Sequence, residues 1–229
     1  MSTRPTDEGL ALSVEVVVFG VDDSDLKLLA RRREGEPFAG RWALPGGLVG
    51  GDEALEGAAR RVLAEAGGVS PAYLEQLYTF GAIDRDPRRR TVSVAYYGLV
   101  RLADPRAPAS APEGGAAWFV ASAAPRLALD HDEIAATARR RLQAKVRYEP
   151  IGFELLPRKF TLSQLQALYE VILERALDKR NFRKKILAMD LLADSGKVEA
   201  DVARRPARLY RFDERRYRRL CKQGFNFEV

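Results

Sequence analysis

The chain has 229 residues, of which 46% are hydrophobic and 31% charged, a composition typical of a globular protein with one or two domains. Its single cysteine, Cys221, excludes an internal disulfide framework and a zinc site built from several thiolates. No segment has the roughly 18 uncharged apolar residues that a membrane span requires, and the first residues carry no signal-peptide pattern. We therefore expect a cytoplasmic protein.

The positive charge of the chain is concentrated in its last third. Residues 151–229 contain 18 Lys and Arg against 11 Asp and Glu, a net charge of +7, whereas residues 1–150 contain 20 against 21. This asymmetry favours a polyanionic partner for the last third, most often nucleic acid, with a solvated basic surface as the alternative.

Apolar patterning predicts strands and helices up to about residue 147. The expected strands are 12–21, 26–32, 73–83, 91–102 and 116–120, and the expected helices are 53–66 and 132–147. The Pro- and Ala-rich segment 103–116 is predicted to be a loop. After residues 148–157 the chain changes to short basic helices, which predicts two domains, 1–149 and 150–229.

Seven residues of the segment that starts at Gly47 stand at a defined spacing. They are Gly47, Glu53, Arg61, Leu63, Glu65, Gly68 and Val69. Their spacing resembles seven of the nine defined positions of the Nudix signature, G-x5-E-x7-R-E-U-x-E-E-x-G-U, in which U is a bulky aliphatic residue. The resemblance implies an α+β fold, with a mixed sheet between helices over about residues 10–147. It also implies a pocket for a nucleoside diphosphate that is linked to a second group.

Both positions that depart from the signature lack a carboxylate. Val62 and Ala66 occupy them, and on a helix they share one face with Glu65. In active members of the family, three carboxylates on this face hold the magnesium ions, and Mg²⁺ requires such oxygen ligands. With Glu65 alone, we predict no catalytic residue, no cofactor and no tightly bound Mg²⁺. Carboxylates elsewhere, such as Asp84 or Asp86, are the alternative source of ligands.

The pocket can still bind a ligand without a metal. Glycine allows the backbone to approach a ligand closely, and a guanidinium group matches the oxygens of a phosphate. The predicted ligand-binding residues are Gly46, Gly47, Arg32, Arg41, Arg85 and Glu65. For each arginine, a solvated surface charge is an equally good interpretation.

The only histidine, His131, lies in the segment "LDHDEI". Asp130 and Glu133 around it have the spacing of a helix-capping pair. We therefore expect His131 at the surface beside a helix cap rather than at a ligand.

The basic last third contains two helices that are joined by a short turn. Thr161 and Gln164 form a capping box at the start of the first helix, and Asp178 is the predicted N-cap of the second helix, which extends to about residue 192. The break between them, 174–177, has the length found in a helix-turn-helix. These two helices therefore predict a DNA-binding unit.

The second helix separates apolar from basic residues. Phe182, Ile186 and Met189 fall on one side, and the cations fall on the other, where they suit phosphates and guanine edges. Two short strands, 197–202 and 208–212, and a terminal helix, 213–224, complete a winged helix. The predicted DNA-contacting residues are Arg180, Asn181, Arg183 and Lys184 on the helix and Arg204 and Arg205 on the wing. A winged helix that binds protein is the alternative.

A degenerate Nudix segment followed by "FELLPRKFTLSQLQALYEVILERALDKRNFRKKIL" and "RLYRFD" resembles the Nudix-related transcriptional regulators of bacterial NAD metabolism. The resemblance covers nearly the whole chain. It implies a homodimer that binds an inverted-repeat operator in double-stranded DNA, usually as a repressor, and that senses ADP-ribose or a related NAD derivative. An active ADP-ribose pyrophosphatase with an appended winged helix is the alternative.

Overall fold

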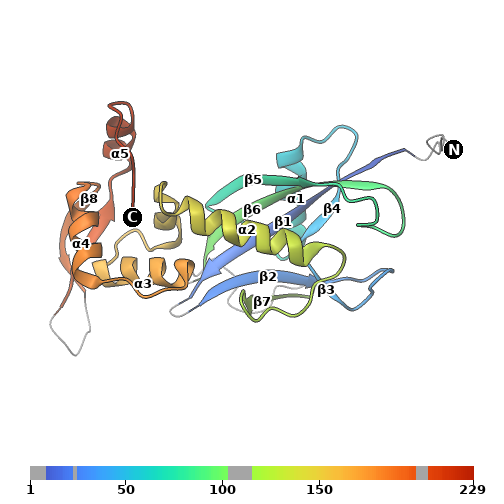
Figure 1. Cartoon of the computed structure of the whole chain (residues 1–229), viewed down its shortest axis with the longest axis horizontal. Helices are drawn as coiled ribbons and strands as arrows, with labels where there is room; N and C mark the ends of the chain where they lie inside the picture. Colours follow the sequence, from blue (N-terminus) through green and yellow to red (C-terminus); the bar gives the residue numbers. More distant parts are fainter. Residues whose placement is uncertain (1–8, 23–24, 103–114, 200–205) are drawn as a thin grey trace.

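A seven-stranded mixed sheet forms the centre of the N-terminal part (Figure 1). The computed structural model describes residues 9–22, 25–102, 115–199 and 206–229. The strands are β1 (Ala11–Val21), β2 (Leu26–Arg32), β3 (Trp42–Ala43), β4 (Gly46–Leu48), β5 (Tyr73–Phe80), β6 (Thr91–Arg101) and β7 (Ala116–Val120). Their order is β3-β2-β1-β6-β5, with β4 also paired to β1 and β7 to β2. Only β1 and β6 are paired in parallel within these strands, so the expected mixed sheet is confirmed.

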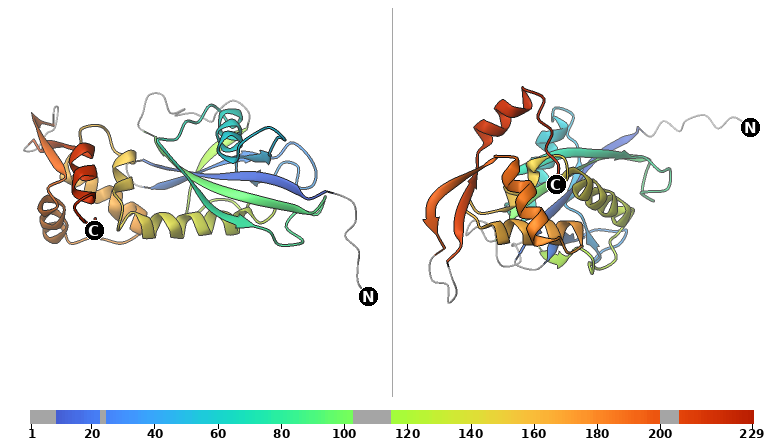
Figure 2. Two further views of the ribbon diagram at one scale, coloured as in Figure 1. Left: turned by 90° about the horizontal axis from the view of Figure 1, so that it is seen from above. Right: turned by 60° about the vertical axis from the view of Figure 1, so that its left-hand side comes forward.

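Each face of the sheet is covered by one helix. Along β1, Val14 and Val16 pack in the core beneath α1 (Leu55–Glu65), whereas Val17 and Phe19 pack in the core beneath α2 (His131–Lys145). Figure 2 shows the two helices on opposite sides of the sheet. Because side chains of a strand alternate between faces, the continuous apolar run of β1 serves both cores.

The C-terminal part is a small winged helix. Its elements are η1 (Pro150–Leu155), α3 (Leu162–Leu173), α4 (Lys179–Ala188), β8 (Leu192–Val198), β9 (Arg208–Phe212) and α5 (Glu214–Cys221). The capping box of Thr161 and Gln164 is present, and the Asp178 side chain accepts a hydrogen bond from the Asn181 amide. Strands β8 and β9 pair antiparallel, and Phe160 makes an isolated bridge to Tyr210. The prediction of a winged helix-turn-helix is therefore confirmed.

Several predicted boundaries were wrong: the strand expected at 73–83 ends at Phe80 and the terminal helix expected at 213–224 spans Glu214–Cys221, and the largest errors lie around residue 190. The second helix ends at Ala188 rather than near residue 192, because Asp190 takes a left-handed conformation (φ 56°) that breaks the helix. Strand β8 therefore begins at Leu192, five residues before the expected start at 197. The short strands β3 and β4 were not predicted, since two or three residues show no periodicity.

The two parts share one hydrophobic core. The cluster beneath α2 continues through Ile151 and Phe153 of η1 into α3 and α4. The end of the chain returns to α2, where the Val229 amide donates to the Arg147 carbonyl at 2.9 Å. Across the described ranges, no helix is both long and apolar enough to cross a bilayer.

Candidate functional site

The backbone of β4 lies against β1 without space for side chains. A Cβ at Gly46 would lie 2.8 Å from the Val14 carbonyl oxygen and 2.9 Å from Cγ of Glu15. A Cβ at Gly47 would lie 3.3 Å from a methyl carbon of Val62 on α1. Glycine at position 46 is therefore required by a close approach of backbone to backbone.

Helix α1 presents apolar side chains where the Nudix signature places two carboxylates. Val62 is fully buried in the core beneath α1, and Ala66 is 3% exposed. Arg61 pairs with Glu53 at 2.8 Å and with Glu65 at 3.1 Å, and it donates to the Leu48 carbonyl at 2.9 Å. The ion pair with Glu53, and secondarily the one with Glu65, raises the pKa of Arg61. The remaining charges of the signature thus brace the loop after β4 against α1.

These residues do not fit a magnesium site. Glu65 is half-exposed and paired with Arg61. Asp86 accepts a bidentate pair of hydrogen bonds from Arg88 at 2.9 and 2.7 Å, which holds the pKa of that carboxyl below its usual range. No group of three or more His, Cys, Asp or Glu that could hold a metal occurs in the ranges the structure describes.

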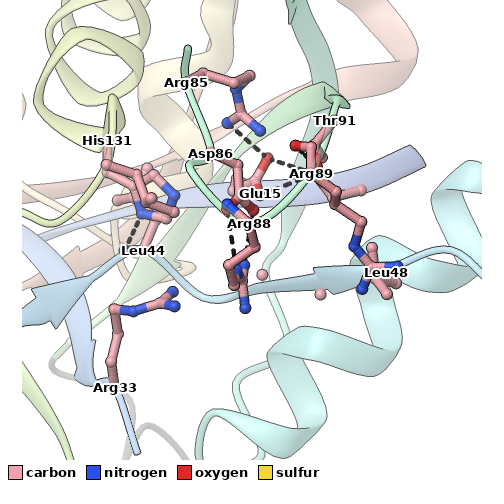
Figure 3. A pocket seen from close by; sticks show the side chains of 14 residues that line it. Glu15, Arg33, Leu44, Leu48, Arg85, Asp86, Arg88, Arg89, Thr91 and His131 are labelled. Atoms are coloured by element: carbon pink, nitrogen blue, oxygen red, sulfur yellow. Dashed lines mark hydrogen bonds and ion pairs between the residues drawn. The ribbon is translucent and has the colours of Figure 1, made fainter. Parts of the chain in front are cut away.

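A cavity of about 210 Å³ opens beside β4 (Figure 3). Its walls come from β1, β4, the segment between β5 and β6, and the start of α2. The polar, charged and glycine residues of the lining are Ser13, Glu15, Arg33, Gly46, Gly47, Arg85, Asp86, Arg88, Arg89, Thr91 and His131. Four arginines against two carboxylates make the lining suitable for an anion.

A buried charge network forms one wall of this cavity. Arg85 donates two hydrogen bonds of 2.8 Å to Asp130, and its guanidinium lies 3.7 Å from the Glu15 carboxylate. Glu15 also accepts from the Ser13 hydroxyl at 3.1 Å. Burial raises the pKa of Glu15 to about 7, although the Arg85 charge acts in the opposite direction. Arg85 therefore lines the cavity, but its guanidinium is hydrogen-bonded to Asp130 and lies beside Glu15.

His131 is buried, so its expected position at the surface was wrong. Its Nδ1 accepts a hydrogen bond of 3.0 Å from the Leu44 amide, and burial lowers the pKa of the imidazole to about 4. The ring is therefore neutral at pH 7, with its proton on Nε2, and Nε2 is buried without a partner in the described chain. The expected cap was also wrong, because Asp130 makes no side-chain cap bond and binds Arg85 instead.

Helix α4 lies at one end of the molecule (Figure 1), and its exposed side chains are largely cationic. Arg180, Asn181 and Lys184 are exposed, whereas Phe182 and Ile186 are buried against the core. Arg183 was expected on the exposed face, but it is half-buried and donates to the Ser163 hydroxyl of α3 at 2.8 Å. Its long side chain reaches back across the helix pair. The predicted wing residues Arg204 and Arg205 lie outside the described residues.

Two family models match the chain, the NUDIX domain over residues 10–138 and the NrtR DNA-binding winged helix domain over residues 152–212. A relative from Acinetobacter baylyi, named ADPR responsive transcriptional repressor NtrR, is 34% identical over 205 residues. The match covers 88% of this chain and 81% of that protein. The chain belongs to the NrtR family.

Solved structures of NrtR have the same architecture. The crystal structure of Shewanella oneidensis NrtR complexed with a 27mer DNA is 35% identical, with a TM-score of 0.77, and the match covers 88% of this chain and 93% of that one. The NUDIX domain of the same protein, crystallised with ADP ribose, is also 35% identical, with a TM-score of 0.52 over 59% of this chain and 90% of that chain. The α+β Nudix fold with a smaller winged helix is thus common to NrtR and this chain.

In this member of the NrtR family, the structure brings three of the six predicted ligand residues to the cavity. Gly46, Gly47 and Arg85 line it. Arg32 instead stacks on the Trp42 ring at 4.9 Å, and Arg41 stacks on the Phe38 ring at 5.3 Å. Neither of these arginines lines the cavity, and Glu65 does not line it either. Their roles in ligand binding stay predictions, which the cavity does not support.

The cavity contains other arginines that the sequence did not single out. Arg33 and Arg89 line it, and neither pairs with a carboxylate in the described part of the chain. The pKa of Arg33 is lowered, first by burial and next by the positive charge of Arg88. Arg33 and Arg88 therefore repel each other across the cavity. Strand alternation could have identified Arg33. Arg32 is paired with Trp42 in the sheet, so the next residue, Arg33, is expected on the opposite face of the sheet from Trp42.

A second hollow of about 250 Å³ adjoins the first. The two share Arg33, Leu44, Gly46 and Arg88 as walls. Together they form an extended basic depression along β4 and the end of β2. Such a shape can take an elongated ligand that carries negative charge near its middle.

Proposed function

We propose that this protein is a DNA-binding transcriptional repressor that senses ADP-ribose or a related NAD derivative through its Nudix part. One observation carries the proposal: a Nudix fold with a basic cavity shares a continuous core with a winged helix whose α4 exposes cations. The relatives support it, because one is named an ADPR responsive repressor and another was crystallised with DNA and, as its NUDIX domain, with ADP ribose.

Hydrolysis is not part of the proposed function. Val62 and Ala66 are buried apolar residues on the face that would hold magnesium, and Glu65 is paired with Arg61. One carboxylate cannot assemble the ligands that polarise a diphosphate and activate water. We therefore propose a ligand sensor without a metal cofactor and without a catalytic residue.

The basic cavity suggests how the effector is held. Arg33 and Arg89, which pair with no carboxylate among the described residues, suit the oxygens of a diphosphate. The Gly46 backbone allows a close approach, and Nε2 of His131 can donate to a ligand oxygen. The adjoining hollow gives room for the second group of the ligand.

The DNA-bound species is proposed to be a homodimer on an inverted repeat that controls genes of NAD metabolism. One winged helix reads about half a site, so a two-fold dimer matches a palindromic operator. The exposed cations of α4 supply the phosphate and base contacts of each half.

The proposed function is tested with full-length protein and a library of random duplexes. The protein should select a palindromic sequence, and fluorescence anisotropy should show that ADP-ribose releases the selected duplex. AMP and ribose 5-phosphate serve as controls, since each carries only part of the ligand. Failure to select any sequence would exclude a sequence-specific regulator, and release by AMP alone would exclude a sensor for the two-part ligand.

A further inference from the structure

Helix α5 is a basic element of the C-terminal part that belongs neither to the helix-turn-helix nor to the wing strands. It follows the wing strand β9 and lies beyond residues 152–212, the segment that matches the winged helix model. No side chain of α5 is fully buried. Tyr217 and Leu220 are its apolar contacts with the core.

The cations of α5 are gathered on its outward face. At about 100° per residue, they occupy an arc of about 100° opposite the midpoint of Tyr217 and Leu220. They are Arg215, Arg218 and Arg219 of α5 and Lys222 at its C-cap, and all four are exposed, whereas Arg216 lies off this face. Arg218 pairs with Glu214, whereas the other three have no ion-pair partner in the described part of the chain. An unneutralised row of cations is complementary to a polyanion.

Contacts with the segment after α4 hold α5 beside this helix. Arg216 pairs with Asp190, which follows the end of α4, and the Asp213 amide donates to the Leu191 carbonyl at 2.9 Å. Figures 1 and 2 show α5 at the same end of the molecule as α4 and the β8–β9 hairpin. Helix α5 therefore lies at the DNA-binding end of the molecule, beside the C-terminal end of α4.

We propose that the outward face of α5 binds the phosphate backbone of the operator on the flank of the bases that α4 reads. This inference rests on the proposed function, because it assigns a second contact to the same DNA. Arg219 and Lys222 neutralise phosphates without reading sequence, so they add affinity and orientation but no base specificity. The footprint thus extends past the contacts of α4 and the wing.

The test compares two charge-reversed proteins on a duplex that the wild-type protein selects. The double variant R219E/K222E changes the α5 face, and R126E/R140E makes the same change in charge at exposed arginines of the Nudix part. Binding of the selected duplex and of a random-sequence duplex is measured by anisotropy over a salt series. Circular dichroism and thermal unfolding verify that both variants fold as the wild type does.

The proposed species is a dimer, so the α5 variant loses two phosphate contacts in each protomer. It should lose at least about tenfold in affinity for both duplexes, and its slope of log K against log salt should be shallower by roughly 4. The control variant should keep the wild-type slope. Trimming the flanks of the selected duplex should weaken the wild type but not the α5 variant. An unchanged slope for R219E/K222E, or equal losses in the two variants, overturns the proposal. If the wild type selects no duplex, the proposed function fails instead.

Discussion

Glu15 is a buried carboxyl whose protonation should be visible in stability. Its pKa is raised from 4.5 in the ordinary state to about 7 in the folded chain, chiefly by burial, with Arg85, Ser13, Asp130 and Asp86 as the polar groups around it. The folded chain therefore binds this proton more tightly than the unfolded chain does. The resulting stabilisation is complete below pH 4.5 and is lost as the pH rises to about 7.

The variant Glu15→Gln removes this dependence. Relative to the wild type, its free energy of unfolding should rise between pH 4.5 and 7.5, by at most about 3 kcal/mol. Urea denaturation at the two pH values measures the change, and the exposed Glu133→Gln is the control. His131 titrates in both proteins, so its effect cancels in the difference. A difference that does not change with pH would show that Glu15 is charged in the fold at neutral pH.

The apolar residues on the metal face have become part of the core. A glutamate at Val62 would place a carboxylate among buried valines of β1, and one at Ala66 would enter a site that is 3% exposed. Val62→Glu with Ala66→Glu should therefore lower the free energy of unfolding by roughly 2–5 kcal/mol rather than restore an enzyme. Denaturation and a Mg²⁺-dependent ADP-ribose assay measure this, with Glu65→Gln as a mild control. A stable double variant with turnover on the order of 1 per second would contradict the prediction.

At the scale of single elements, local signals predicted two of the three expected caps. The caps at Thr161 and Asp178 each join groups three residues apart and need no tertiary information. The cap expected at Asp130 has the same spacing but failed, because Arg85 from a distant segment binds that carboxylate. The wall of the cavity was missed for the same reason. His131 meets Leu44 across 87 residues, and Arg85 meets Asp130 across 45, contacts that only the closed sheet creates.

The structure shows which residues of α4 should be changed to test DNA binding. Reversal of Arg183 would also remove its contact with Ser163, so a loss of binding could reflect a displaced α3. The exposed pair Arg180→Glu and Lys184→Glu avoids this, and it should reduce affinity for the selected duplex by at least 100-fold, because several phosphate contacts and base contacts are lost. Anisotropy at about 150 mM salt measures the effect. Unchanged affinity with an unchanged melting temperature would exclude α4 as the reading helix.

At the scale of the whole molecule, α2 joins the basic cavity to the winged helix. His131, at its first residue, lines the cavity. Arg139 on the same helix pairs with Glu174 at the end of α3, and the Arg147 carbonyl just after α2 accepts from Val229. The tail that contains Val229 also touches α4, since Glu228 pairs with Lys185 at 3.1 Å. Helix α2 is therefore connected by direct contacts to α3 and, through the end of the chain, to α4.

This connection predicts a reciprocal coupling between effector and operator. ADP-ribose can shift DNA affinity only by the difference between its own affinities for the DNA-free and DNA-bound forms, and coupling of about 1–3 kcal/mol corresponds to roughly 5–150-fold. The operator should weaken ADP-ribose binding by the same factor that ADP-ribose weakens operator binding. Isothermal titration of ADP-ribose into free and DNA-bound protein gives one factor, and anisotropy gives the other. The variant Arg139→Ala removes the ion pair with Glu174 and should reduce both factors equally, since coupling is a property of the pair of sites. The affinity for each ligand alone should stay within about twofold of the wild-type value.

Equal dissociation constants for ADP-ribose in the two wild-type titrations would show that the cavity is not the sensor.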